Sequence, residues 1–172
     1  MFDITENARV YPITRAIDRT GAVISASAWV NMENVEKAIW ILSCGSLSST
    51  STFAVTLYVA NDGSGTKSVA IATASCDMVL PHYYLNSSGD VWAKTTVTAS
   101  TFNITSASNS KCYILEAKAE DMGQFLSTAV TYDATHVRLA AASPGANACL
   151  TACTCIVTGL RYGQDTPPVV TG

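Results

Sequence analysis

Hydrophobic and polar residues alternate with a period of two along much of this chain, most clearly in residues 53–59. Phe53, Val55 and Leu57 fall on one side of that segment, and Thr56 falls on the other. Successive side chains of a β-strand point to opposite faces of a sheet, so this pattern predicts a strand with one buried face.

About nine such segments follow one another, separated by turn-forming residues. They are expected at residues 22–30, 38–44, 53–59, 69–74, 83–86, 91–99, 112–119, 136–142 and 148–160. Residues 101–105 are read as a continuation of 91–99 past a kink, and residues 120–123 as one helical turn. The Asn-Asp-Gly-Ser-Gly run at 61–65 favours a hairpin turn, because Gly and Asn tolerate positive φ.

Residues 38–44, Ala-Ile-Trp-Ile-Leu-Ser-Cys, are almost continuously apolar instead of alternating. Such a run is typical of a strand buried on both faces, although the period alone also allows a segment of buried helix. Trp40 is expected in the core.

These strands and the lack of a sustained helical period predict an all-β fold, an antiparallel β-sandwich of jelly-roll type. We expect an extended N-terminal arm over residues 1–20, a sandwich domain over 21–163 and an extended or flexible tail over 164–172. The arm would fray or pair with a neighbouring subunit, and a strand of the domain's own sheet is an equal alternative. The tail contains Pro167-Pro168.

Composition removes several classes of protein. Charged residues make up 13% of the chain, hydrophobic residues 48%, and the net charge is -3. This is the reverse of a disordered chain or a coiled coil, and it argues against nucleic acid as the main partner. Apolar stretches of about eight residues are too short to span a membrane, and the N-terminal residues do not resemble a signal peptide. We therefore expect synthesis in a cytosol and no membrane partner.

The six cysteines are expected to be free, buried thiols in a reducing compartment. They are Cys44, Cys76, Cys112, Cys149, Cys153 and Cys155. The last three share one parity and would face the same way on a regular strand. A metal site there is not favoured, because His82 and His136 stand alone in the sequence.

No pattern in the sequence supports catalysis. His82 and His136 have unremarkable neighbours, and His82 is expected at a surface or interface. Residues 63–67 lack the spacing of a phosphate loop, and Glu120-Asp121 is typical of a solvated turn. We assign no catalytic residue, cofactor or metal ligand, and expect that the protein is not an enzyme.

Aromatic residues leave one binding alternative open. Trp29 and Trp92 would serve a sugar-binding surface if they were exposed. A place in the core or in a subunit contact is the preferred interpretation for both.

The sequence resembles small β-rich structural proteins encoded among the head and virion genes of tailed bacteriophages. The likeness lies in the order and style of segments at residues 17–21, 28–37, 113–116, 120–122, 135–139 and 159–162. The resemblance implies a capsid decoration (cement) protein on the exterior of a virion, made in the host cytoplasm. Its partners would be the major capsid protein and its own copies, with a trimer suited to three-fold positions of a shell. It implies no catalytic residues.

Two other roles remain open: a carbohydrate-binding module of a phage surface fibre, and a head–tail connector or tail component. The shortage of charge also carries an expectation of its own. Low-charge strand faces should lie against other subunits, and the protein should not persist as a free monomer.

Overall fold

The computed structural model describes residues 8–18, 29–47, 52–65, 68–70, 80–85, 92–97, 101–105, 111–124, 134–142 and 149–159. These residues form β-strands and a 3-10 helix, η3 (Ala119–Gln124). The strands are β1 (Ala8–Asp18), β2 (Val30–Asn31), β3 (Lys37–Leu47), β4 (Thr52–Ala60), β5 (Ser68–Ala70), β6 (Leu80–Leu85), β7 (Trp92–Val97), β8 (Thr101–Thr105), β9 (Lys111–Lys118), β10 (His136–Ala141) and β11 (Cys149–Thr158). No helix in this part of the chain is long and apolar enough to cross a membrane.

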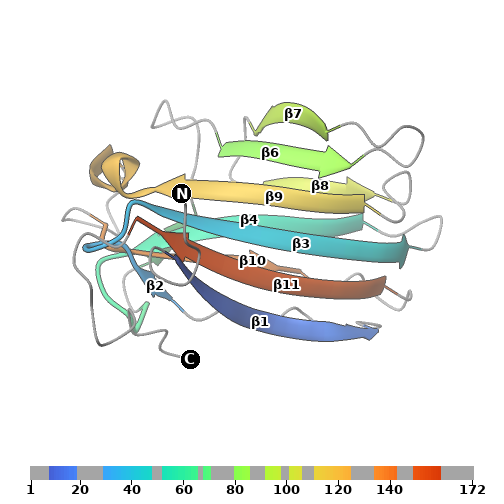
Figure 1. Ribbon diagram of the computed structural model, residues 1–172, viewed down its shortest axis with the longest axis horizontal. Helices are drawn as coiled ribbons and strands as arrows, with labels where there is room; N and C mark the ends of the chain where they lie inside the picture. Colours follow the sequence, from blue (N-terminus) through green and yellow to red (C-terminus); the bar gives the residue numbers. More distant parts are fainter. Residues whose placement is uncertain are drawn as a thin grey trace.

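The strands form two antiparallel sheets that lie one in front of the other (Figure 1). The six-stranded sheet has the order β1-β11-β3-β9-β6-β7. The five-stranded sheet has the order β2-β10-β4-β5, and β8 also pairs with β4. β8 pairs with the first part of β4 and β5 with the last part, so the two share one edge of that strand.

The pairing is that of a jelly roll. β4 pairs with β8, β3 with β9, β2 with β10 and β1 with β11, so the chain is a long hairpin with nested strand pairs. Rolling this hairpin adds the pair β11–β3, which joins β1–β11 to β3–β9 in one sheet, and the pair β10–β4, which joins β2–β10 to β4–β8 in the other. The all-β jelly-roll sandwich predicted from the sequence is thus confirmed. β5, β6 and β7 are inserted between β4 and β8.

Two strands were not among the nine expected. Residues 8–18, assigned to an arm, form β1, which pairs with β11 from Ala8 opposite Thr158 to Asp18 opposite Leu150. This edge strand accommodates Pro12 because only one side of it is paired, and its register shifts between Pro12 and Thr14. Over these residues the structure shows the alternative that the sequence left open, a strand of the domain's own sheet, so the sandwich includes residues before 21. Residues 1–7 and 164–172 lie outside the described part of the chain.

The second addition is β8. The sequence analysis treats residues 101–105 as a continuation of the preceding strand, but β7 pairs with β6 in one sheet and β8 with β4 in the other. The kink is thus a crossing between sheets. The expected hairpin from β4 to β5 and the helical turn at η3 are both confirmed.

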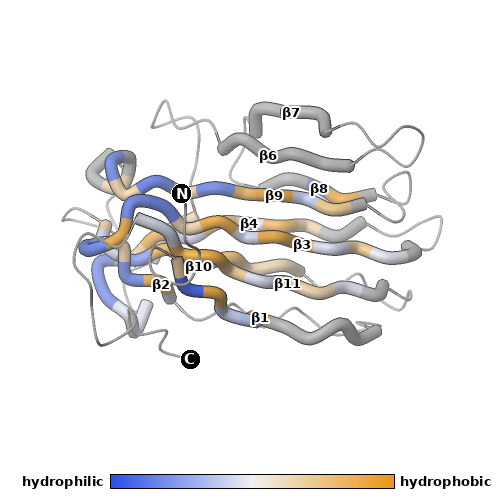
Figure 2. Tube along the Cα trace, in the orientation of Figure 1, coloured by the Kyte–Doolittle hydropathy of each residue, from blue (hydrophilic) through white to orange (hydrophobic). Residues whose placement is uncertain are grey.

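The core lies between the sheets. On β4 the buried residues are Val55, Leu57 and Val59, in the predicted phase, and Trp40 on β3 is fully buried as expected. Hydrophobic positions run along the strands, whereas hydrophilic positions gather at the end of the sandwich that carries β2 and η3 (Figure 2).

β3 departs from its prediction in one respect. Its buried side chains are Ala38, Trp40, Leu42 and Cys44, whereas the residues between them are only partly buried or exposed. Within one chain this strand therefore buries a single face, although its sequence is typical of burial on both.

Candidate interaction surface

The outward side of four strands of the six-stranded sheet, β1, β11, β3 and β9, is largely apolar over its described residues. Ile39 and Ile41 point outward from β3, because Ala38, Trp40 and Leu42 point into the core. Directly paired residues of antiparallel strands share a side, so the register identifies their neighbours. Three rows cross the sheet: Val10, Ile156, Ile39 and Glu116; Pro12, Thr154, Ile41 and Ile114; and Ala152, Ser43 and Cys112. We call these rows the isoleucine face.

This face is partly exposed over the residues that the structure describes. Val10 is 54% exposed, and the four isoleucines are each partly exposed. In Figure 1, β1, β11, β3 and β9 lie in front of the other sheet, and no labelled strand or helix is drawn across them. Sheet faces that meet water usually carry polar side chains at alternate positions, so this composition calls for a covering layer.

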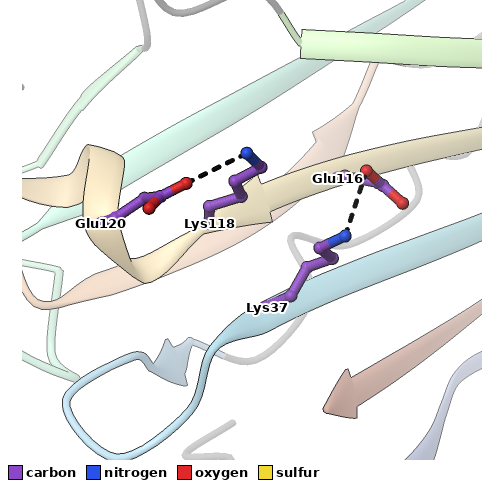
Figure 3. Close-up of polar contacts among 4 residues, drawn as sticks. All are labelled: Lys37, Glu116, Lys118 and Glu120. Atoms are coloured by element: carbon purple, nitrogen blue, oxygen red, sulfur yellow. Dashed lines mark hydrogen bonds and ion pairs between the residues drawn. The ribbon is translucent and has the colours of Figure 1, made fainter. Parts of the chain in front are cut away.

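Two ion pairs stand at one end of the isoleucine face. Lys37 and Lys118 are directly opposite on β3 and β9, and each has an acidic partner (Figure 3). Lys37 Nζ lies 3.6 Å from Glu116 Oε2, and Lys118 Nζ lies 3.0 Å from Glu120 Oε1. The centre of the face is left neutral.

The outward side of the five-stranded sheet has a different chemistry. The Arg138 guanidinium carbon lies 4.4 Å from the centre of the Trp29 ring and 5.4 Å from that of Tyr58. We call these three residues the arginine cluster. Stacking on two rings holds the cation by cation–π attraction and covers the aromatic surface.

The turn after β4 packs against Trp29 of the arginine cluster. Asp62 Oδ1 accepts hydrogen bonds from the backbone N–H of Ser64 and of Gly65, each 2.9 Å, and from the Ser64 hydroxyl at 2.6 Å. The Ser64 hydroxyl is the largest cause of the lowered pKa of Asp62. Gly65 has φ +66°, and a Cβ there would lie 2.5 Å from Nε1 of Trp29. Glycine is thus required both by the backbone and by the closeness of the indole.

His136 belongs to the same sheet and is hydrogen-bonded to the neighbouring Thr135. The Thr135 hydroxyl donates to the Asn61 carbonyl oxygen at 2.8 Å, so it can only accept from His136 Nδ1, also at 2.8 Å. Burial is the largest cause of the lowered pKa of His136. A hydrolase triad would need a serine hydrogen-bonded to a histidine, and that histidine to a carboxylate. Here the Ser64 hydroxyl is hydrogen-bonded to Asp62 and His136 to Thr135, so these residues do not form that arrangement.

The tryptophans and cysteines can be compared with their predictions. Trp29 is 3% exposed, so the expectation that it could lie open to a sugar is wrong, and its preferred assignment to a buried position is confirmed. Cys153 and Cys155 both point into the core, where burial raises the pKa of each to about 12. They therefore share one face as their parity predicts. Cys44 is buried and Cys112 is partly exposed, and none of these four cysteines is in a disulfide.

The remaining candidates fall outside the described side chains. These are the side chains of His82, Trp92 and Cys149, and all of Cys76. Among the residues the structure does describe, no group of three or more His, Cys, Asp or Glu is placed to hold a metal ion. The sequence analysis missed both the isoleucine face and the arginine cluster. The signal for the isoleucine face was the almost continuously apolar run at 38–44. The signal for the arginine cluster was Gly65, but its contact with Trp29 becomes visible only in the fold.

Comparison with known proteins adds little. No family model matches the chain, and no curated protein matches it. A solved structure of the SPBc2 prophage-derived protein YomS is similar at a TM-score of 0.46 with 9% sequence identity, over 89% of this chain and 94% of that one. At this level the likeness carries no conclusion about function.

Proposed function

We propose that this protein is a structural component of a tailed-bacteriophage virion. In the finer form of the proposal it decorates the capsid exterior, where it binds the major capsid protein and copies of itself. It takes part as a building block, without a cofactor, a metal or a reaction of its own. The sequence resemblance to phage head and virion proteins supplies the context for this role.

The observation that carries the proposal is the isoleucine face. A structural subunit must bury surface against other chains, and the centre of such a contact is depleted in charge. The isoleucine face meets that requirement, because Glu116, the one charged residue in its rows, is paired with Lys37, and its central row, Pro12, Thr154, Ile41 and Ile114, is uncharged.

Of the other two roles, the sugar-binding one fits less well. A sugar-binding module usually offers an exposed aromatic ring, and Trp29 is covered by Gly65 and Arg138. A head–tail connector or tail component would use an apolar face in the same way as a decoration protein. Only its place on the particle would differ.

The test is to purify particles of the phage that encodes the chain and to separate heads from tails. Mass spectrometry then gives the copy number of the chain relative to the major capsid protein in each fraction. We expect many copies on the heads, released before the shell itself breaks down. A few copies confined to tails would favour the connector or tail role, and absence from both fractions would contradict a virion role.

A further inference from the structure

We propose that the isoleucine face is a self-association surface, which packs against the same face of a second copy. The inference rests on the self-association in the proposed function, and it names the surface and the partner that carry it.

The first argument is the mismatch between sequence and burial on β3. The apolar run at 38–44 is typical of a strand covered on both sides, yet in the described part of the chain only the side of Trp40 and Leu42 is fully buried. The same strand leaves Ile39 and Ile41 outward, beside Ile156 and Ile114 of the neighbouring strands. A second layer of side chains would supply the missing cover.

Charge makes a second copy a suitable partner. The isoleucine face has no net charge at its centre, so two copies can meet without opposing like charges. The cations at its end, Lys37 and Lys118, are each paired within the chain at 3.6 and 3.0 Å. A strongly charged partner surface would lose its hydration against Ile41 and Ile114 and gain no counter-charge there.

Area sets how much of the sheet the contact must use. Strands about 4.8 Å apart, with a rise of about 3.3 Å per residue, give the whole six-stranded sheet a flat face of roughly 700 Å², of which the three rows of the isoleucine face make up roughly 300 Å². A stable protein–protein contact buries about 800 Å² per partner, so the dimer must bury nearly the whole outward side of this sheet, with the isoleucine face at its centre. Sheets packed in this way lie about 10 Å apart, as the two sheets of a sandwich do.

The symmetry follows from the use of one surface. A face that meets itself forms an isologous contact, which closes at two copies. A trimer, the state suited to three-fold positions of a shell, needs two different surfaces on each chain. Among the outward residues that the structure describes, the four isoleucines all lie on the isoleucine face.

The experiment is sedimentation velocity on the full chain over about 1 to 100 μM, a range suited to micromolar affinity. The variants are Ile41→Lys at the centre of the face and Thr154→Lys beside it. Thr154 is already polar and partly exposed, so its replacement preserves the fold if Ile41→Lys does not. The matched control is Ala140→Lys, which places the same charge outward on β10 of the other sheet. Circular dichroism verifies folding of each.

We expect the wild type and Ala140→Lys to sediment as a species of about 36 kDa, twice the 18.1 kDa of one chain. Both lysine variants of the isoleucine face should be folded monomers, with Kd raised at least about thirtyfold. A monomeric wild type, a trimer, or a dimer unaffected by either lysine would overturn the proposal. A dimer that is absent from virus particles would overturn only the virion role. A chain that is present in particles but monomeric in solution would overturn only this pairing.

Discussion

The two outward faces of the sandwich follow the same alternation but carry opposite chemistry. On the five-stranded sheet, the positions between buried residues hold Tyr58, His136 and Arg138. On the six-stranded sheet, the equivalent positions hold Ile39, Ile41 and Ile114. The first face is stabilised within the chain by ring stacking and hydrogen bonds. The second is completed only by another layer.

This difference teaches that burial within one chain is an incomplete guide to which face is solvated. An antiparallel sheet with one face in water shows alternating apolar and polar residues, as the five-stranded sheet does. The six-stranded sheet combines that geometry with the composition of a sheet covered on both sides. Variants of the two faces should therefore have separable effects. Variants of the arginine cluster should change the stability of the chain, and variants of the isoleucine face should change its association with a second copy.

Trp29→Ala should have the largest effect on stability. Although Trp29 lies on the outward side of its sheet, it is 3% exposed, and its removal leaves a cavity beneath Gly65 and Arg138. We expect the free energy of unfolding to fall by about 3–5 kcal/mol in urea titration at low protein concentration. Trp29→Phe, which keeps a ring beside Arg138, is the control and should lose less. A loss below about 1 kcal/mol would show that the arginine cluster is not an internal stabilising element.

Gly65→Ala should rank second. Its φ of +66° disfavours any side chain, and the new Cβ would lie 2.5 Å from the Trp29 indole. We expect about 2 kcal/mol of destabilisation, measured by thermal unfolding. Ser64→Ala, at the preceding and exposed position, removes the 2.6 Å hydrogen bond to Asp62 and should be less destabilising than Gly65→Ala. Equal losses for the two variants would contradict the contact between the turn and Trp29.

Ile41→Thr should have a smaller effect on the unfolding of the single chain. Ile41 is only partly buried in the chain, so we expect a loss below about 1 kcal/mol at low protein concentration. The same variant should become more destabilised relative to wild type as concentration rises, because it loses association as well. A large loss that does not depend on concentration would indicate that the chain itself covers the isoleucine face.

Protonation of His136 should have the smallest effect. Burial lowers its pKa in the folded state below the ordinary value of 6.5. The unfolded chain therefore binds the proton first, so the stability contributed by neutral His136 is complete above pH 6.5 and is lost as the pH falls through the lowered pKa. Urea titrations at about pH 7.5 and 5.5 should show a smaller decline for His136→Gln than for wild type. Asp62, whose pKa is lowered from 3.8, stays ionised over this range. An equal loss of stability between the two pH values in wild type and His136→Gln would rule out a contribution of His136 to the pH dependence.

The alternation in residues 53–59 was enough to predict β4 and its buried face, and the turn residues at 61–65 predicted the hairpin that follows. Local pattern could not place β8, because whether a strand continues in its sheet or crosses to the other depends on its partners. β1 was left as one of two equal alternatives for a related reason. Pro12 and the surrounding charges disfavour a central strand, but an edge strand tolerates them.

The candidate surface was partly visible in the sequence. The run at 38–44 predicted burial on both sides of one strand, which is the signal of the isoleucine face. It could not show that Ile114 and Ile156 join Ile39 and Ile41, because that depends on register between strands distant in sequence. The arginine cluster likewise depends on residues from separate strands and one turn, and it leaves no local pattern.

The most direct test of the central claim, that the isoleucine face is covered by a second chain, is the alkylation rate of Cys112. This partly exposed thiol lies in the third row of the face, beside Ser43, whereas Cys153 and Cys155 are buried with pKa values of about 12 and serve as slow internal references. Mass spectrometry of peptides after timed treatment with iodoacetamide gives each rate. The account predicts that Cys112 reacts more slowly as the concentration of the wild type rises and at a constant rate in Thr154→Lys. A Cys112 rate that stays constant while the wild type dimerises would contradict it.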